Sequence, residues 1–175
     1  DRYTGMYQMN NRVVANGTPL DHRIDNVARV GVRAGYHPVV FGYTDVGADP
    51  RQITDPTDWR LSHYEGVLPG FDELLCLDER HEPWLEWLRS LGYDATDPDD
   101  MLATEHERPA EHSVTTFLTD TFLGWLDGRG APATDDPWFA HLSFIRPHPP
   151  YSAAGHYSTM YDPASLPDPL PIPPD

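Results

Sequence analysis

The chain has 175 residues and a formal net charge of −16, and all of its basic residues are arginines. Nucleic-acid binding depends on basic stripes that follow the phosphates, and the sequence contains none, so we expect no nucleic-acid partner. The longest apolar run, residues 138–145, is too short to span a membrane, so we expect no membrane partner. A small anion can still bind where a metal ion or clustered donors outweigh the overall charge.

Both ends of the sequence indicate a segment of a longer protein. The chain opens on DRYTGMY, without an initiator methionine or a signal peptide, and closes on the proline-rich LPDPLPIPPD. Its length fits one domain. We therefore expect residues 1–175 to be an internal part of a single domain, and the compartment stays open between cytoplasm and periplasm.

Residues 19–43 predict a helix followed by a buried strand. Asp21 is the expected N-cap of the helix, and Gly35 suits the position after its last turn. One apolar face of the helix is expected to contain Ile24, Val27 and Ala28. The run HPVVFGY, residues 37–43, is too uniformly apolar for a half-exposed strand and predicts a buried one.

Residues 45–92 predict a long surface excursion and then a second helix. The stretch 45–75 is rich in Asp, Pro, Thr and Gly and has no clear period. A helix is predicted in EPWLEWLRSLG, where Trp84, Leu88 and Leu91 form an apolar stripe. Cys76 stands alone in the apolar setting LLCL, so it predicts an inert core residue and excludes an intrachain disulfide.

Residues 93–109 predict an acidic irregular stretch, and a third helix and a second buried strand follow it. The helix is expected over about residues 113–127, with Ser113 as its N-cap and Gly128 as its stop. Residues 130–137 indicate a loop rich in turn-forming residues. The run WFAHLSFI, residues 138–145, predicts the strand.

Two buried strands separated by helices predict an α/β fold with a mainly parallel or mixed sheet covered on both faces. In such sheets ligands bind beyond the carboxyl ends of the strands. The segments that follow the two strands are GYTD, residues 42–45, and RPHPPY, residues 146–151. These two segments are therefore the predicted places for chemistry.

His148 in the RPHPPY turn is the candidate catalytic residue. Pro147 and Pro149 restrict the residues before them to extended conformations, so the backbone sets the direction of the imidazole. A histidine ordered in advance suits proton donation to a leaving group. The alternative is that the prolines only end the strand and that His148 caps a neighbouring group.

Asn16, Tyr43 and Asp45 are the candidate substrate-binding residues. The phenol of Tyr43 and the amide of Asn16 can donate hydrogen bonds to an anionic oxygen, and Asp45 can orient a neighbour. Both motifs are also ordinary turn sequences, GYTD with an aspartate cap and NG as a turn signal. The residues alone leave these alternatives open.

The two acidic clusters predict no metal site within this chain. TEHERPAEH, residues 104–112, contains two histidines and three glutamates, but Pro109 keeps the histidines off a common helix face. We interpret it as a solvated acidic loop. DATDPDD, residues 94–100, lacks the glycine and glutamate spacing of a calcium loop.

In order along the chain, these segments resemble the sulfatase family of the alkaline phosphatase superfamily. TGMYQMNNRVVANGTPLD is similar to the stretch after the family's C-x-P-x-R nucleophile signature. VGVRAGYHPVVFGYT and DPWFAHLSFIRPHPPYSAAGHYSTMYDP resemble two later family segments. The match is poor over about residues 45–110, which we interpret as an insertion. Tyr43, Asn16 and the complete R-P-H-P-P turn resemble the phosphonate monoester hydrolase branch of the family. That branch has a threonine at the position of Asp45.

The resemblance implies hydrolysis of a small-molecule sulfate, phosphate or phosphonate ester. The nucleophile would be a formylglycine about six residues before Asp1, by extension of the family motif. A divalent metal (Ca, Mn or Mg) would be held by ligands that also lie outside this chain. His148 would act on the leaving oxygen, with Asn16 and Tyr43 donating to the other oxygens and Asp45 beside them. A homo-oligomer of the full-length protein is compatible with this family.

The resemblance also fixes what the 175 residues lack. Without nucleophile and metal ligands, we expect this polypeptide alone to turn over no ester. The alternative hypothesis is a catalytically silent relative that binds an anionic or sugar ligand. The residues upstream of Asp1 distinguish the two, because an absent C-x-P-x-R motif would favour the silent relative.

Overall fold

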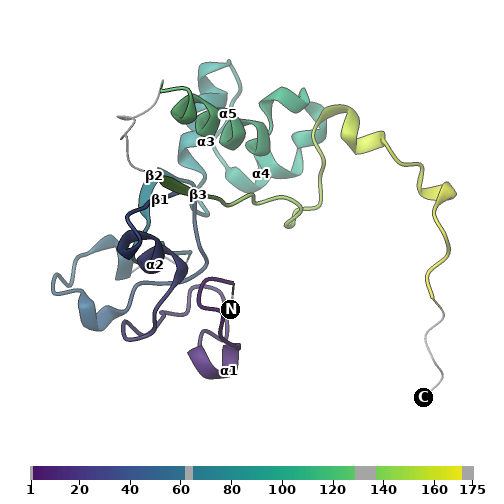
Figure 1. The fold of residues 1–175 in the computed structure, drawn as a ribbon. Helices are drawn as coiled ribbons and strands as arrows, with labels where there is room; N and C mark the ends of the chain where they lie inside the picture. Colours follow the sequence, from purple (N-terminus) through teal and green to yellow (C-terminus); the bar gives the residue numbers. More distant parts are fainter. Residues whose placement is uncertain (1, 62–64, 129–136, 171–175) are drawn as a thin grey trace.

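The computed structural model describes residues 2–61, 65–128 and 137–170. Three parallel strands form its sheet in the order β2-β1-β3, with β1 (His37–Gly42) between β2 (Asp72–Cys76) and β3 (Trp138–Leu142) (Figure 1). The predicted α/β fold, the parallel pairing and the two predicted strands are confirmed. The loop predicted at 130–137 lies outside the described residues except for Pro137.

Strand β2 was not predicted from the aperiodic stretch 45–75. Its residues, DELLC, pair with β1 along one edge and are mostly half-buried. A short strand that follows a long irregular loop has no periodicity of its own beyond the apolar LLC. Cys76 ends β2, and burial raises the pKa of its thiol to about 12, so the thiol stays protonated at neutral pH and unreactive.

Helices cover both faces of the sheet. Helix α2 (Val27–Arg33) lies on one side, and α3 (Glu82–Ser90) and α5 (Val114–Leu126) lie on the other (Figure 1). The main core lies under α3 and α5, where Phe41 of β1 packs with Trp84 and Leu118. Burial on both faces explains why β1 is apolar at successive positions.

The predicted caps and stripes are partly confirmed. Ser113 caps α5, since its side chain accepts a hydrogen bond from the backbone N–H of Thr116. Trp84 and Leu88 of α3 are buried, but Leu91 follows the helix and is 44% exposed. The predicted place of Leu91 in the core stripe is therefore wrong.

Helix α2 begins later than predicted. Its N-cap is Asn26, whose side chain accepts from the backbone N–H of Arg29, and not Asp21. The Asn26 amide also donates to the Pro69 carbonyl, so tertiary contact fixes where the helix begins. Ala28 is fully buried while Val27 is 40% exposed. Gly35 follows the helix in the left-handed region, as predicted.

The predicted irregular stretch 93–109 contains helix α4 (Pro98–Ala103), which Asp97 caps. A further short helix, α1 (Gln8–Asn11), lies near the start of the chain. Short 3₁₀ segments lie at Pro50–Gln52, Trp59–Leu61, Glu105–Glu107, Ala110–His112, Gly155–Thr159 and Pro163–Ser165. Among the described residues, no helix has the length and apolar character needed to cross a membrane.

A close backbone approach joins the loop after β1 to the loop at residues 16–20. The Gly17 N–H donates to the Asp45 carbonyl at 3.0 Å, and the Leu20 N–H donates to the Gly47 carbonyl at 3.3 Å. A Cβ at Gly47 would lie 2.7 Å from the Gly17 carbonyl oxygen. Only a residue without a side chain fits this contact, so Gly47 holds the two loops together.

A buried carboxyl group lies behind the same loop. Thr44 donates to the Gly66 carbonyl and accepts from the Leu68 N–H, which attaches residues 65–68 to the loop. Glu65 is 6% exposed and accepts a hydrogen bond from the Glu79 N–H. Burial is the main reason why the pKa of Glu65 is raised to about 7, and nearby carboxylates add to the effect.

Replacing Gly47 by Ala should lower the free energy of unfolding by about 1–3 kcal/mol, because the added methyl overlaps backbone that cannot move aside. The control is Gly124→Ala in α5, where an added methyl meets nothing within 4 Å. The control should raise stability by up to about 1 kcal/mol, since alanine favours the helix. Urea denaturation measures both, and equal effects would contradict the close contact.

Glu65→Gln should remove a pH-dependent loss of stability. A carboxyl whose pKa is about 7 in the folded protein and 4.5 when unfolded destabilises the fold as pH rises between these values. Glutamine keeps an oxygen acceptor for the Glu79 N–H. The variant should therefore gain about 1–3 kcal/mol relative to wild type between about pH 4.5 and about pH 8. Denaturation series across this range would contradict the assignment if the exposed Glu111→Gln gave the same change.

Candidate functional site

The chain that leaves β3 passes beside the start of the GYTD loop at the carboxyl edge of the sheet, and the RPHPPY turn follows it. Gly42 ends β1 and Ser143 follows β3, and the Ser143 N–H donates to the Phe41 carbonyl at 2.9 Å. A Cβ at Gly42 would lie 2.9 Å from the Ser143 side chain. The glycine thus lets the chain after β3 pass directly beside the GYTD loop, as expected for neighbouring parallel strands.

A cavity of about 370 Å³ opens at this edge and brings two of the predicted residues together, Asn16 and Asp45. It joins the first residues of the chain to the loops after β1 and β3. Its lining consists of Arg2, Tyr3, Gln8, Val13, Ala15, Asn16, Thr44, Asp45, Val46 and Ser143. The lining residues from the start of the chain were not predicted, because nothing in DRYTGMYQ marks them locally as facing this edge.

Asp45 is the charged group that the loop holds at the cavity. Its backbone φ of 58° lies in the left-handed region, which aspartate tolerates better than most residues. Burial raises the pKa of Asp45, and the positive charges of His148 and Arg2 act in the opposite direction. Arg2 lines the cavity with Asp45, whereas His148 is not among its lining residues.

Asn16 and Tyr43 occupy different environments. Asn16 is exposed on its turn, and the neighbouring Gly17 binds the Asp45 backbone, so the amide lies at the mouth of the same cavity. Tyr43 is 8% exposed and is not part of the cavity lining. The structure therefore brings Asn16 to Asp45, while the substrate contact of Tyr43 stays a prediction.

His148 is exposed in the turn after β3, and its ring orientation is defined. Its Nδ1 lies 2.8 Å from the Pro149 carbonyl oxygen, and its backbone N–H donates to the Ile145 carbonyl at 2.9 Å. A carbonyl oxygen can only accept, so Nδ1 carries the proton in this contact. Nε2 is then the ring nitrogen that can take up or release a proton.

Arg146 stabilises the backbone of this turn through hydrogen bonds. Its Nη1 donates to the carbonyls of His148 and Pro150 at 3.0 and 2.6 Å. Its Nε and Nη2 contact the same oxygen of Glu105, Oε2, at 2.8 and 2.7 Å. The interpretation of residues 104–112 as a solvated acidic loop is therefore wrong for Glu105, whose side chain is 2% exposed. A buried carboxylate without a charged partner would be costly, and Arg146 provides that partner.

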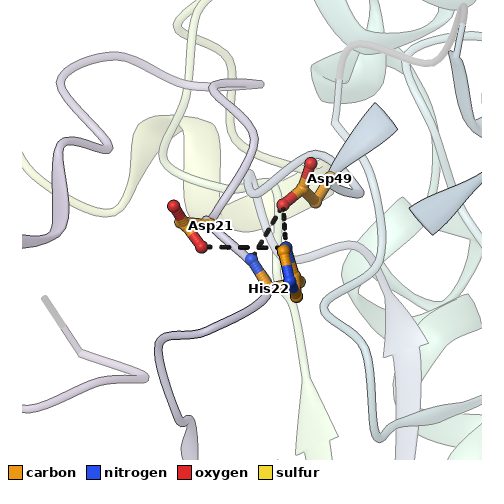
Figure 2. Close-up of side chains that lie close together, drawn as sticks. All are labelled: Asp21, His22 and Asp49. Atoms are coloured by element: carbon orange, nitrogen blue, oxygen red, sulfur yellow. Dashed lines mark hydrogen bonds and ion pairs between the residues drawn. The ribbon is translucent and has the colours of Figure 1, made fainter. Parts of the chain in front are cut away.

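A second group of side chains has the spacing of a metal site. Oxygen and nitrogen atoms of Asp21, His22 and Asp49 lie within 4.8 Å of one another (Figure 2). However, Arg51 contacts both carboxylates, at 2.7 Å from Asp49 and 3.0 Å from Asp21, and Arg23 contacts Asp21 at 2.7 Å. These arginine hydrogen bonds hold the pKa of Asp21 and of Asp49 far below the usual range. The two carboxylates are thus already matched by arginines.

The cavity itself offers few ligands for a divalent cation. Among the described residues that line it, Asp45 is the carboxylate, and Asn16 and Gln8 add amides. Calcium and magnesium take six or more oxygen ligands, of which carboxylates are the most frequent charged ones. These residues do not fit a cation site by themselves, so ligands from elsewhere in the protein would be required.

Comparison with known proteins gives the same family along nearly the whole chain. The sulfatase family model matches residues 3–166. The multifunctional alkaline phosphatase superfamily protein PehA of Trinickia caryophylli is 32% identical over 180 residues, which cover 95% of this chain and 34% of that protein.

Two solved structures are similar to this chain in sequence and in fold. The phosphonate monoester hydrolase of Agrobacterium radiobacter is 43% identical with a TM-score of 0.79, covering 95% of this chain and 34% of that one. The phosphonate monoester hydrolase SpPMH of Silicibacter pomeroyi is 41% identical with a TM-score of 0.83, covering 98% and 36%. This chain spans about a third of the length of these relatives. The chain belongs to the sulfatase family.

Proposed function

We propose that the full-length protein hydrolyses small-molecule esters of sulfuric, phosphoric or phosphonic acid. The observation that supports this most directly is the carboxyl edge of the sheet, where Asn16 and Asp45 line a cavity together with Ser143, from which the chain continues to the turn of His148. The family and the two similar phosphonate monoester hydrolases support the same reaction class. The nucleophile in this proposal is a formylglycine outside these residues.

The proposal includes a divalent metal ion, Ca, Mn or Mg, in the full-length protein. Its ligands would lie outside this chain, in keeping with the few donors at the cavity. When bound, such an ion supplies positive charge that activates a nucleophile and offsets the charge of the transition state. The residues described below act on the substrate itself.

Asn16 and Tyr43 are proposed as donors to the non-bridging oxygens of the ester. Asn16 is exposed and lines the cavity, so an anion there would meet this residue. Tyr43 would donate from its buried position two residues before Asp45. Such donors stabilise charge that grows in the transition state more than the charge of the bound ester.

His148 is proposed to protonate the leaving oxygen through Nε2. Its Nδ1 is bound to the Pro149 carbonyl, which fixes the ring and leaves Nε2 as the nitrogen that exchanges protons. The ring is therefore ordered before the substrate arrives, which lowers the entropic cost of the step.

Asp45 is proposed to lie next to the bound anion and to repel it in part. Burial favours its protonated form, while Arg2 and His148 favour the charged form. The carboxylate would hold Arg2 near the cavity and would bring an unfavourable charge close to the ester. Substrate binding should therefore respond to removal of this one charge.

His148→Ala in the full-length protein should lower kcat/KM about 10²–10⁴-fold for esters with basic leaving alcohols. The loss should shrink as the leaving alcohol becomes more acidic, since an acidic alcohol needs no proton. Kinetics on a series of aryl and alkyl esters measure this trend, with exposed His156→Ala as the control. An equal loss for all esters would reduce His148 to a positioning role.

Asp45→Asn should lower KM for an anionic ester about two- to fivefold at low ionic strength, because it removes a repulsive charge at the cavity. Added salt should reduce the difference, since it screens partly exposed charges. The control is Asp120→Asn, which removes the same charge from an exposed position on α5. An increase in KM would show instead that Asp45 holds the anion through Arg2 or His148.

A further inference from the structure

We propose that Glu105 is a positioning residue for His148 and that it acts through Arg146. This inference rests on the proposed hydrolysis. It concerns a buried ion pair that touches no substrate in the proposal above. Its basis is the set of contacts that joins Glu105 to the backbone of the histidine turn.

The guanidinium of Arg146 binds the backbone of the turn at His148 and after it. Nη1 donates to the His148 carbonyl at 3.0 Å and to the Pro150 carbonyl at 2.6 Å. The Ile145 carbonyl accepts from the His148 N–H at 2.9 Å, which closes the turn on the other side. The direction of the imidazole therefore depends on where the guanidinium lies.

Glu105 fixes the guanidinium in turn. Its Oε2 lies 2.8 Å from Arg146 Nε and 2.7 Å from Nη2, and Nη2 also donates to the Leu102 carbonyl at 2.6 Å. The other carboxylate oxygen, Oε1, accepts from the Val114 N–H at 3.0 Å, at the first residue of α5. Arg146 is thus bound directly to the last turn of α4 and, through Glu105, to the start of α5.

Burial makes this arrangement rigid. The exposed fraction of the side chain is 2% for Glu105 and 13% for Arg146. A charged pair with so little access to water cannot exchange its partner for solvent without a large cost. A side chain that fixes the reacting group within a fraction of an ångström can change the rate by orders of magnitude without contacting the substrate.

The test uses the full-length protein, with Glu105→Gln and the exposed Glu111→Gln as its control. A glutamine whose oxygen still accepts from the Val114 N–H turns its NH₂ group toward the guanidinium, which then loses its acceptor. We expect kcat/KM to fall about ten- to a hundredfold for esters with basic leaving alcohols and less for acidic ones. A merely structural role would lower the rate equally for all esters.

The double variant Glu105→Gln/His148→Ala provides the decisive measurement. If Glu105 acts through the histidine, the double variant should be no slower than His148→Ala alone. A multiplicative loss in the double variant, or an unchanged rate in Glu105→Gln, would overturn the proposal.

A second variant covers the case in which Glu105→Gln does not fold. Glu105→Gln/Arg146→Met removes both charges, so no unpaired charge stays buried. It should show the same leaving-group trend as Glu105→Gln, and a folded pair variant with the wild-type trend would overturn the proposal. A wild-type protein without hydrolysis would instead overturn the proposed function and this inference with it. His148→Ala without a leaving-group trend would overturn the proposed role of His148 and this inference, but not the hydrolysis.

Discussion

The ion pair between Arg146 and Glu105 is the interaction on which the histidine side of the site depends. One guanidinium contacts the turn after β3, the last turn of α4 and the carboxylate that receives the first N–H of α5. Removing one partner of such a buried pair typically costs about 3–5 kcal/mol, because the other charge is left without a partner. The position of His148 is therefore set by tertiary contacts as much as by the neighbouring prolines.

The other side of the site depends on close contact between backbones. Gly47 and Gly17 bring two loops together, and this contact places Asn16 beside Asp45. Gly42 performs a similar function where the chain after β3 passes β1. An added methyl group at Gly42 or Gly47 would separate the groups that the cavity brings together. An ion pair therefore stabilises the histidine side of the site, whereas glycines that allow close backbone contact stabilise the other side.

The sequence predicted those parts of the fold that have local patterns. The periodicity of residues 113–127 and the apolar runs of β1 and β3 were sufficient, and the parallel sheet followed from them. Strand β2 was missed because DELLC follows an aperiodic stretch, and the start of α2 was misplaced because Asn26 is fixed by Pro69, 43 residues away. The acidic composition of residues 104–112 predicted a solvated loop, which was wrong for Glu105 because its partner Arg146 lies 41 residues further on. A charge that is buried by a distant partner leaves no local signal.

The distribution of arginines limits how this acidic chain can meet an anionic ester. Arginines that contact neighbouring carboxylates include Arg23, Arg33, Arg51, Arg60, Arg80, Arg89 and Arg146. Their charge is already matched, so it contributes little to the potential at the cavity. Arg2 lines the cavity with Asp45, and that carboxylate offsets part of its charge. An anion that enters this cavity in a chain with a net charge of −16 therefore needs positive charge from outside these residues. This requirement is the physical reason to place the divalent ion of the proposed function in the parts of the protein beyond this chain.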